Sequence, residues 1–269
     1  MGMFEFSDNE ILSFFAVLVR ITVLFAVLPL LGDRFVPSTL KVLFGLATSF
    51  IVFPSLTAKG FIHTEDAAVW GSSVAGITWM IVQEAGLALI LGYTARLIFD
   101  AIQFGGNLVG NFMGFSAANT FDPHQESQTQ VIAELQAALA TLVFLSLDGH
   151  YLMLKAALDS FHWVGLGKAA LGSSVSHQLT LFTAKVIEFG VLLSAPIAIC
   201  LFVVNVAFGI MAKAMPQLNV LVLSFAVSAL VGLAILLIGL PEFQSVSGSV
   251  LGRVDEWLID IIKAIKADG

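Results

Sequence analysis

The stretch LNVLVLSFAVSALVGLAILLIGL, residues Leu218–Leu240, decides the class of fold. Its 23 residues carry no charge. At 1.5 Å per residue they would form a helix about 34 Å long, which is enough to cross the hydrocarbon core of a bilayer. Pro241 follows directly and is expected to end the helix. This stretch therefore predicts a transmembrane helix.

The composition of the whole chain also indicates a membrane protein. Of 269 residues, 58% are hydrophobic and 12% are charged, whereas soluble domains carry about 25% charged residues. The net charge is −7, and the 12 Lys and Arg residues are scattered. Because phosphate binding needs a clustered basic face, nucleic acid is not expected as a partner. The acidic start lacks the positive region of a cleaved signal peptide, so the first apolar segment is expected to remain.

Further apolar segments extend this pattern to about six long, partly kinked helices arranged in hairpins, which predicts an all-α integral membrane protein. Ala67 to Phe99 is longer than one crossing needs and is expected to be one bent helix or two stacked pieces, with a break near Gln83 favoured. Between Asp148 and Thr180 we expect an extended, mixed excursion between helices. The other predicted helices are Ile11 to Leu31, Leu40 to Phe53 ending at Pro54, Val131 to Leu147, Leu181 to Ala212 bent by Pro196, and an amphipathic helix from Val254 to Ile265.

A glycine-rich run, FGGNLVGNFMGF from Phe104 to Phe115, lies between two of these apolar segments. Its four glycines would cost a helix roughly 4 kcal/mol relative to alanine, while its Phe and Met side chains resist exposure to water. Two structures fit this pattern. Either the run is irregular backbone that is buried in protein or lines a cavity, or it is a helix whose small residues let another helix approach closely. In both cases the run is expected to face protein.

Five ionisable residues fall in or beside apolar segments, where a lone charge costs a few kcal/mol and normally finds a partner or a watery cavity. They are Arg20, Glu84, Glu134, Lys185 and Glu188. Lys185 and Glu188 are three positions apart and can pair along one helix face, and Arg20 can pair with Glu84 or with Glu134. The alternative is a proton or ion path of the kind found in secondary transporters.

The sequence shows no motif of an enzyme, a cofactor site or a metal site. Its five histidines lack the HxxxH and HExxH spacings, and no phosphate-binding or dinucleotide-binding glycine motif occurs in a strand context. Cys200 stands alone in an apolar stretch and is expected to be a small buried hydrophobic residue. We therefore expect no enzymatic activity, no cofactor and no metal.

Six short motifs occur in a fixed order over nearly the whole chain. They are PLLGDR (Pro29 to Arg34) with Val36-Pro37, LGYTARLIF (Leu91 to Phe99), QFGGNLVG (Gln103 to Gly110), MGFS (Met113 to Ser116), FDP (Phe121 to Pro123) and LDGH (Leu147 to His150). Taken in their order and spacing, these motifs resemble the FliR family of flagellar type III export-gate proteins. The related injectisome export-gate subunits of the SctT type are similar but agree less around Met113 to Pro123, so the flagellar family is preferred.

This resemblance implies a non-enzymatic subunit of the export gate, in the bacterial inner membrane at the flagellar basal body. It further implies assembly with FliP, FliQ and FlhB, in contact with membrane lipid, into a helical cone around a pore through which unfolded flagellar proteins are exported. The chain would comprise a FliP-like part over residues 1–130, a connecting helix and excursion over 131–180, and a FliQ-like hairpin with an amphipathic tail over 181–269.

The resemblance also implies a site. The constriction of the family matches this chain from Phe104 onward, so residues 104–119 are expected to form a plug in the mouth of the pore. Glycines let the backbone pack or move, and Phe and Met side chains offer a deformable apolar seal. The plug residues are Phe104, Gly105, Gly106, Gly110, Phe112, Met113, Gly114 and Phe115.

Three other functions stay open at the level of sequence. One is an injectisome export-gate subunit, and another is a purely structural membrane scaffold. The third is a stand-alone proton-coupled secondary transporter that would use Glu84 and Glu134. On the export-gate hypothesis, these two carboxylates and the other three ionisable residues are assigned to subunit contacts or buried ion pairs.

Overall fold

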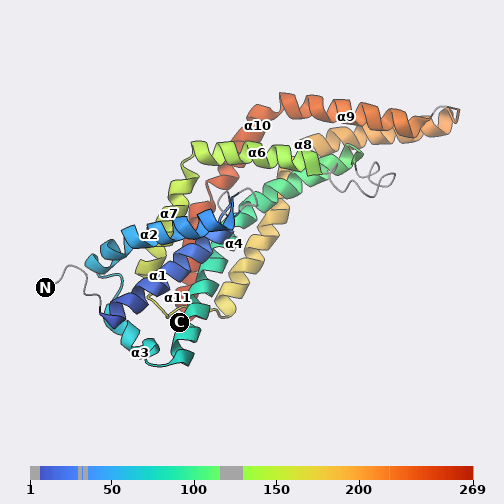
Figure 1. Ribbon diagram of the computed structural model, residues 1–269. Helices are drawn as coiled ribbons and strands as arrows, with labels where there is room; N and C mark the ends of the chain where they lie inside the picture. Colours follow the sequence, from blue (N-terminus) through green and yellow to red (C-terminus); the bar gives the residue numbers. More distant parts are fainter. Residues whose placement is uncertain (1–6, 30–31, 33–35, 116–129, 218, 269) are drawn as a thin grey trace. The chain divides into compact units, whose positions relative to one another are not determined.

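The computed structural model describes residues 7–29, 32, 36–115, 130–217 and 219–268, and the regular elements in these ranges are all helical (Figure 1). They are α1 (Asp8–Val27), α2 (Ser38–Ala58), η1 (Thr64–Asp66), α3 (Ala67–Gly71), α4 (Val74–Phe112), α6 (Gln130–Ser146), α7 (Gly149–Trp163), α8 (Ser173–Ala214), α9 (Val220–Ile238), α10 (Leu240–Leu251) and α11 (Val254–Asp268). Among these residues, five helices are long and apolar enough to cross a membrane, or six if α6 and α7 are one broken span. The predicted all-α membrane fold class is confirmed.

The chain divides into two compact units that each combine distant parts of the sequence. The first unit comprises residues 1–97, 150–182 and 253–269, and the second comprises 98–149 and 183–252. The long helices α4 and α8 each contribute residues to both units. The division into parts 1–130, 131–180 and 181–269 stays a prediction.

In the first unit, α1 and α2 lie side by side (Figure 1). Ser7 begins α1 with a capping box: its backbone N–H donates to Glu10 Oε2 at 2.8 Å, and Glu10 N–H donates to Ser7 Oγ at 3.3 Å. The two helices approach closely at Gly45, where a Cβ would lie 3.0 Å from the Cα of Thr22. The predicted helix over Ile11 to Leu31 is therefore found, but it begins three residues earlier, at Asp8, and ends four residues earlier, at Val27.

The helix α2 does not end at Pro54, as the sequence suggested, but continues to Ala58. Proline removes one backbone hydrogen bond from a helix interior. In this last turn the Thr57 hydroxyl donates to the carbonyl oxygens of Phe53 and Pro54, at 3.1 and 3.0 Å. The expectation was wrong because a single missing hydrogen bond does not stop a helix whose last turn is supported in this way.

The helix α4 is continuous over 39 residues, so the expected break near Gln83 is wrong. Glycine in its middle makes room for a neighbouring side chain instead of interrupting the helix. A Cβ at Gly86 would lie 2.7 Å from Cδ1 of Leu171. The cost of glycine in a helix is thus offset by close packing against the segment that precedes α8.

The predicted excursion between Asp148 and Thr180 contains a regular helix, α7, which was missed. Its buried side chains recur at intervals of three and four residues, as one face of a helix requires. They are Met153, Ala156, Ala157, Ser160 and Phe161. This period was readable in the sequence, but four glycines and scattered histidines around it favoured an irregular assignment.

The amphipathic terminal helix is confirmed as α11. All six apolar positions expected to form its inner face are buried, and they are Val254, Trp257, Leu258, Ile261, Ile262 and Ile265. Trp257 stacks on Phe182 near the start of α8, with ring centroids 4.5 Å apart. The last helix is therefore part of the core of the first unit.

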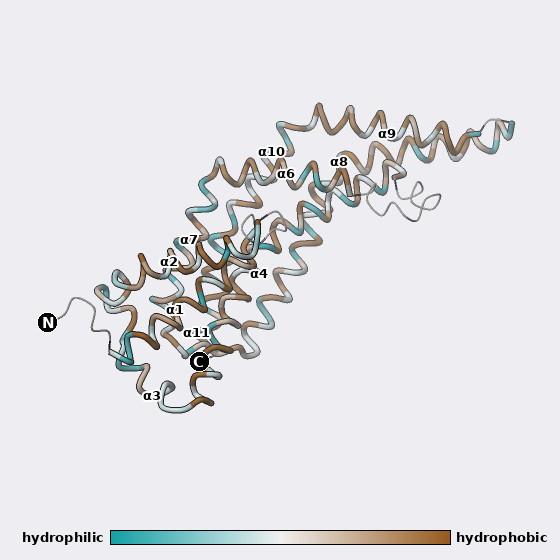
Figure 2. Tube along the Cα trace, viewed as in Figure 1, coloured by the Kyte–Doolittle hydropathy of each residue, from teal (hydrophilic) through white to brown (hydrophobic). Residues whose placement is uncertain are grey.

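The second unit contains α9, which is the most apolar of the five described helices that could span a membrane, and Figure 2 shows hydrophobic residues along most of it. Pro196 lies inside α8, which continues past it to Ala214. Many large apolar side chains on α8 and α9 are exposed, among them Phe202 at 58% and Leu230 at 70%. Cys200 is exposed on α8 as well, so its expected burial is wrong. Apolar surfaces of this extent need lipid or other proteins to cover them.

Candidate functional site

The glycine-rich run begins as the last part of α4. Phe104 to Phe112 is helical, so the second of the two alternatives, a helix with small residues on its surface, describes this part of the run. Gly105 lies against Gly190 of α8: a Cβ at position 105 would be 2.8 Å from the carbonyl oxygen of Gly190. A Cβ at position 190 would likewise be 2.9 Å from the carbonyl oxygen of Ala101. The two backbones are in direct contact because neither residue has a side chain.

The next glycine faces a different helix. A Cβ at Gly106 would lie 2.5 Å from the Cα of Ala133 and 3.0 Å from Oε1 of Gln136, both on α6. Successive residues of a helix point about 100° apart, so Gly105 and Gly106 allow close approach of α8 and α6 on two neighbouring faces. Gly110 is buried one turn further along. The glycines therefore fix the end of α4 between two helices.

The helix ends at Phe112, and the chain then turns. Met113 N–H still donates to Val109 at 2.9 Å, whereas Gly114 N–H donates to Asn111 at 3.1 Å. Gly114 has φ +87°, a left-handed conformation that glycine adopts without strain and that commonly ends helices. The turn thus begins within the predicted plug, at Met113 and Gly114.

Asn205 of α8 holds this helix end by its side-chain amide. Its Nδ2 donates to the carbonyl oxygen of Phe112 at 3.1 Å, and its Oδ1 accepts from the Ser228 hydroxyl of α9 at 3.0 Å. The last carbonyl groups of a helix lack partners within the helix, so Asn205 satisfies one of them. A single polar side chain on α8 therefore links the end of α4 to the middle of α9.

An apolar cluster surrounds the same turn. Met113 is fully buried, and Gly232 of α9 leaves the space for it, since a Cβ at position 232 would lie 2.7 Å from Met113 Cγ. Phe115 meets Phe225 of α9 edge to face, with centroids 5.8 Å apart. The cluster comprises Val109, Met113, Ile132, Ile197, Leu201 and Leu236, with Phe112, Phe115, Val231, Ile235 and Leu240 packed against it.

The structure thus places the predicted plug residues within one unit. Gly105, Gly106, Gly110 and Met113 are buried, whereas Phe104, Phe112, Gly114 and Phe115 are half-buried. Residues 116–119 of the predicted plug lie outside the described residues. We refer to Met113, Gly114 and Phe115 below as the turn segment.

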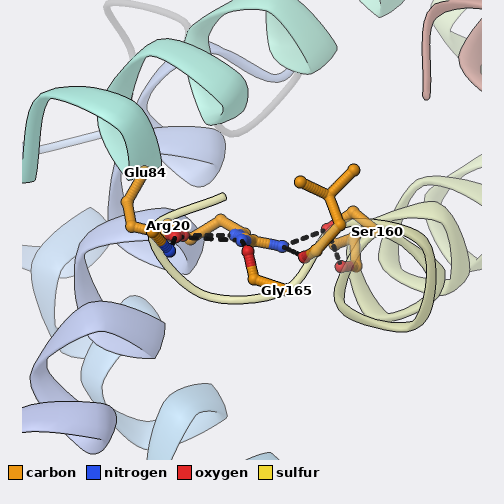
Figure 3. Close-up of polar contacts among 7 residues, drawn as sticks. Arg20, Glu84, Ser160 and Gly165 are labelled. Carbon is orange, nitrogen blue, oxygen red and sulfur yellow. Dashed lines mark hydrogen bonds and ion pairs between the residues drawn. The ribbon is translucent and has the colours of Figure 1, made fainter. Parts of the chain in front are cut away.

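The first unit holds a buried charge network centred on Arg20 (Figure 3). Arg20 pairs with Glu84: Nη2 donates to Oε1 at 3.0 Å, and Nε donates to Oε2. Their side chains are 1% and 0% exposed. Of the two carboxylates considered for Arg20, the structure therefore uses Glu84.

Both charges have further partners in the last turn of α7 and in the connection between α7 and α8. Arg20 Nη1 donates to Ser160 Oγ at 3.3 Å and to the carbonyl oxygen of Val164 at 3.1 Å. Glu84 Oε1 accepts from Gly167 N–H at 2.7 Å. The Arg20 guanidinium also lies 4.2 Å from the centroid of the Phe161 ring. A buried ion pair needs such additional hydrogen bonds to offset its desolvation, and here they fasten the 164–167 connection to α1 and α4.

The other three ionisable candidates are less enclosed. Glu134 on α6 and Glu188 on α8 are exposed, and Lys185 on α8 is half-buried. Their assignment to subunit contacts stays a prediction. Within the described ranges, no group of three or more His, Cys, Asp or Glu residues could hold a metal ion.

Several residues of these two sites were missed in the sequence. Asn205 and Ser228 are polar residues within strongly apolar helices, and that contrast was a readable signal. Phe225 and Gly232 carried no distinguishing signal, because their importance comes from lying opposite the turn segment.

Comparison with known proteins gives consistent results over nearly the whole chain. The family described as Bacterial export proteins, family 1, matches residues 11–254. The flagellar biosynthetic protein FliR of Escherichia coli (strain K12) is 27% identical over 252 residues, which are 94% of this chain and 93% of that protein. The FliR protein of Bacillus subtilis (strain 168) is 28% identical over 94% of this chain and 95% of that protein. That of Pectobacterium carotovorum is 28% identical over 96% of each.

Proposed function

We propose that this chain, which belongs to family 1 of the bacterial export proteins, forms part of the protein-conducting channel of the flagellar type III export gate and carries a closure of that channel. The chain is a component of the flagellar export apparatus, since its relatives over more than nine tenths of its length are FliR proteins. Its apolar helices, together with the identity of these relatives, support a location in the bacterial inner membrane.

The finer parts of the proposal concern assembly. We infer that the chain works with FliP, FliQ and FlhB at the basal body and passes unfolded flagellar proteins, without catalysing a reaction. The exposed apolar faces of α8 and α9 support this proposal, because they offer surface for neighbouring subunits as well as for lipid. A structural scaffold without a channel is the competing outcome of the experiment below.

The closure is proposed because burial and a hydrogen bond hold the turn segment in place. Burial of a Met side chain stabilises by about 1.5–3 kcal/mol, and a hydrogen bond such as that from Asn205 to Phe112 adds about 1 kcal/mol. Contacts of this size are strong enough to keep the channel closed in the resting state. They are also weak enough to be replaced by contacts with an exported chain, whereas a permanent structural element would have to stay in place.

The chemistry of the segment suits a seal. Met113 has a flexible thioether side chain that adapts to irregular surfaces, and Phe115 adds an aromatic ring. Apolar constrictions of this kind stop ions by excluding water. Gly114, in its left-handed conformation, offers a point at which the backbone can turn.

The test is the ion permeability of liposomes that contain the chain together with its membrane partners. The double variant Met113→Ala/Phe115→Ala should increase ion leak, because it removes the side chains that exclude water. Val69→Ala, which shortens an apolar side chain that is 80% exposed on α3, serves as the control and should leave the leak unchanged. Equal leak from the double variant and the parent, in complexes of equal mass, would favour the scaffold.

The structure gives no support to a transporter that uses Glu84 and Glu134 as carriers. Glu84 is fully buried and engaged by Arg20 and by Gly167 N–H, whereas Glu134 is exposed on α6.

A further inference from the structure

We propose that a cavity in the first unit binds the head group of an anionic phospholipid. The cavity has a volume of about 810 Å³ and lies beside the early turns of α4, the end of α7 and the segment that leads into α8. Lys168 and Lys266 line it together with apolar side chains, chiefly Trp79, Val82 and Trp163. No part of this inference depends on the channel function proposed above.

The position of the cavity corresponds to the surface of a membrane. The helices α4 and α8 are both long and apolar enough to span a bilayer, and both begin near the cavity, at Val74 and Ser173. The ends of spanning helices lie at the boundary between hydrocarbon and water. Tryptophan is enriched at this boundary, and Trp79 and Trp163 are 64% and 42% exposed.

The charge of the lining selects an anion. Among the described residues that line the cavity, the charged ones are Lys168 and Lys266, although the chain as a whole has 19 acidic and 12 basic residues. Lys266 Nζ lies 5.1 Å from the centroid of the Trp163 ring. Basic pockets between helices at the membrane surface are the usual sites for phosphate head groups.

Asp66 opposes this charge at one point. Its Oδ2 lies 2.7 Å from Lys168 Nζ, but the two side chains are 36% and 62% exposed. Exposed ion pairs of this kind contribute little and exchange partners readily. A phosphate can therefore approach Lys168, and Asp66 should weaken its binding rather than prevent it.

The segment that leads into α8 forms one wall of the cavity, and contacts with α1 and α4 hold it in place. Gln83 Nε2 donates to the carbonyl oxygen of Ala169 at 3.1 Å. Gly86 provides the space in which Leu171 contacts α4, and the Arg20–Glu84 pair holds the connection just before these residues. Because the segment that carries Lys168 is already ordered, binding would not have to pay for ordering it.

The apolar part of the cavity favours a lipid over a free phosphate ion or an acidic peptide. Val82 and Leu171 line it and are 51% and 47% exposed. Together with the two Trp rings, these side chains form an apolar surface beside the two lysines. The acyl chains of the lipid would lie on this surface, along α4. A water-soluble anion would gain nothing from this surface.

The experiment uses the chain extracted in mild detergent with the membrane partners that accompany it, then stripped of lipid. Native mass spectrometry follows the binding of dioleoyl phosphatidylglycerol and dioleoyl phosphatidylethanolamine to this sample. Phosphatidylglycerol should bind the tightest site about tenfold more strongly, the effect expected of one or two lysines at an anionic surface. The double variant Lys168→Gln/Lys266→Gln should lose this preference, and Asp66→Asn should increase it.

Lys263→Gln is the matched control, because Lys263 lies on the exposed side of α11, one turn from Lys266, and does not line the cavity. It should bind both lipids as the parent does. The proposal is overturned if the two lipids bind equally, if the double variant keeps the preference, or if inorganic phosphate at the same concentration displaces the phosphatidylglycerol. Displacement of the phosphatidylglycerol by an acidic peptide would assign this surface to a protein partner. That result would also overturn the lipid proposal.

Discussion

Gly232 and Met113 form a matched pair: the missing side chain of Gly232 on α9 leaves the space that the Met113 side chain fills at the end of α4. A Cβ at position 232 would lie 2.7 Å from Cγ and 2.8 Å from Cε of Met113. Met113 has no exposed surface in this position. Because a methionine side chain is flexible, a larger residue at position 232 would displace Met113 without having to move the backbone of α9.

The first prediction follows from this pair. Gly232→Ala should displace Met113 from the apolar cluster and raise the ion leak of the assembled complex in liposomes, while the complex keeps its mass. Gly209→Ala on α8 is the control, because a Cβ there meets nothing within 4 Å. That variant should gain up to about 1 kcal/mol of helix stability and leave the leak unchanged. If both alanine variants leak equally, Met113 does not contribute to a seal.

The second prediction concerns the contact between Gly105 and Gly190. Gly105→Ala places a Cβ 2.8 Å from the carbonyl oxygen of Gly190 and 3.4 Å from Cβ of Leu193. The nearest obstacle is backbone, which cannot rotate away, so α4 and α8 must separate. Overpacking of this kind costs about 1–3 kcal/mol, and the midpoint of thermal unfolding in detergent should fall. An unchanged or higher midpoint, as expected for Gly209→Ala, would show that the helices have room to adjust.

The sequence correctly predicted the helices that have a strong hydrophobic or amphipathic pattern. The predictions were wrong at positions where packing against other segments determines whether a helix continues. The uncharged stretch that became α9 and the apolar face of α11 were recognised because a single property, hydropathy, defines them. The break expected at Gln83 was wrong because the sequence does not show that a glycine faces Leu171. The end expected at Pro54 was wrong because one lost hydrogen bond is a small term in a helix of 21 residues.

The candidate site shows the same limit. Sequence reasoning found the glycine-rich run and the ionisable residues, and it offered Glu84 as one of two partners for Arg20. It could not choose between the partners, because residues 64 positions apart meet only through the tertiary fold. Nor could it find Asn205 as the residue that binds the carbonyl group of Phe112.

The third prediction is that the buried pair tolerates joint replacement better than loss of one member. Arg20→Met or Glu84→Leu alone leaves an unpaired charge at a site with at most 1% exposure, which should lower the free energy of unfolding by about 3–5 kcal/mol. The double variant Arg20→Met/Glu84→Leu should recover most of this loss, because both charges are gone. Thermal midpoints and expression levels of the four proteins form the double-mutant cycle.

A surface pair provides the comparison. Lys168 and Asp66 are 62% and 36% exposed, so Lys168→Ala should cost about 1 kcal/mol or less. Additive effects of Arg20→Met and Glu84→Leu would contradict the pairing in the structure.

The fourth prediction is a pH dependence at the start of α8. Asp268 Oδ2 accepts from the backbone N–H groups of Gly172 and Val175 at 3.0 and 3.2 Å, and its Oδ1 accepts from Ser174 N–H at 3.2 Å. The Ser174 side chain, followed by these N–H groups, lowers the pKa of Asp268, although desolvation opposes the shift. The ionised carboxylate thus caps α8 from the last residues of α11.

Because the pKa of Asp268 is lower in the folded state, its contribution is complete above the ordinary pKa of aspartate and is lost as the pH falls through the lowered value. Hydrogen-exchange protection of the Ser174 and Val175 amides, corrected for intrinsic exchange, should therefore be constant from about pH 7 to pH 5 and decline below about pH 4. In Asp268→Asn the protection should be lower throughout and should not change over this range. An equal decline in both proteins would assign the effect to other carboxylates.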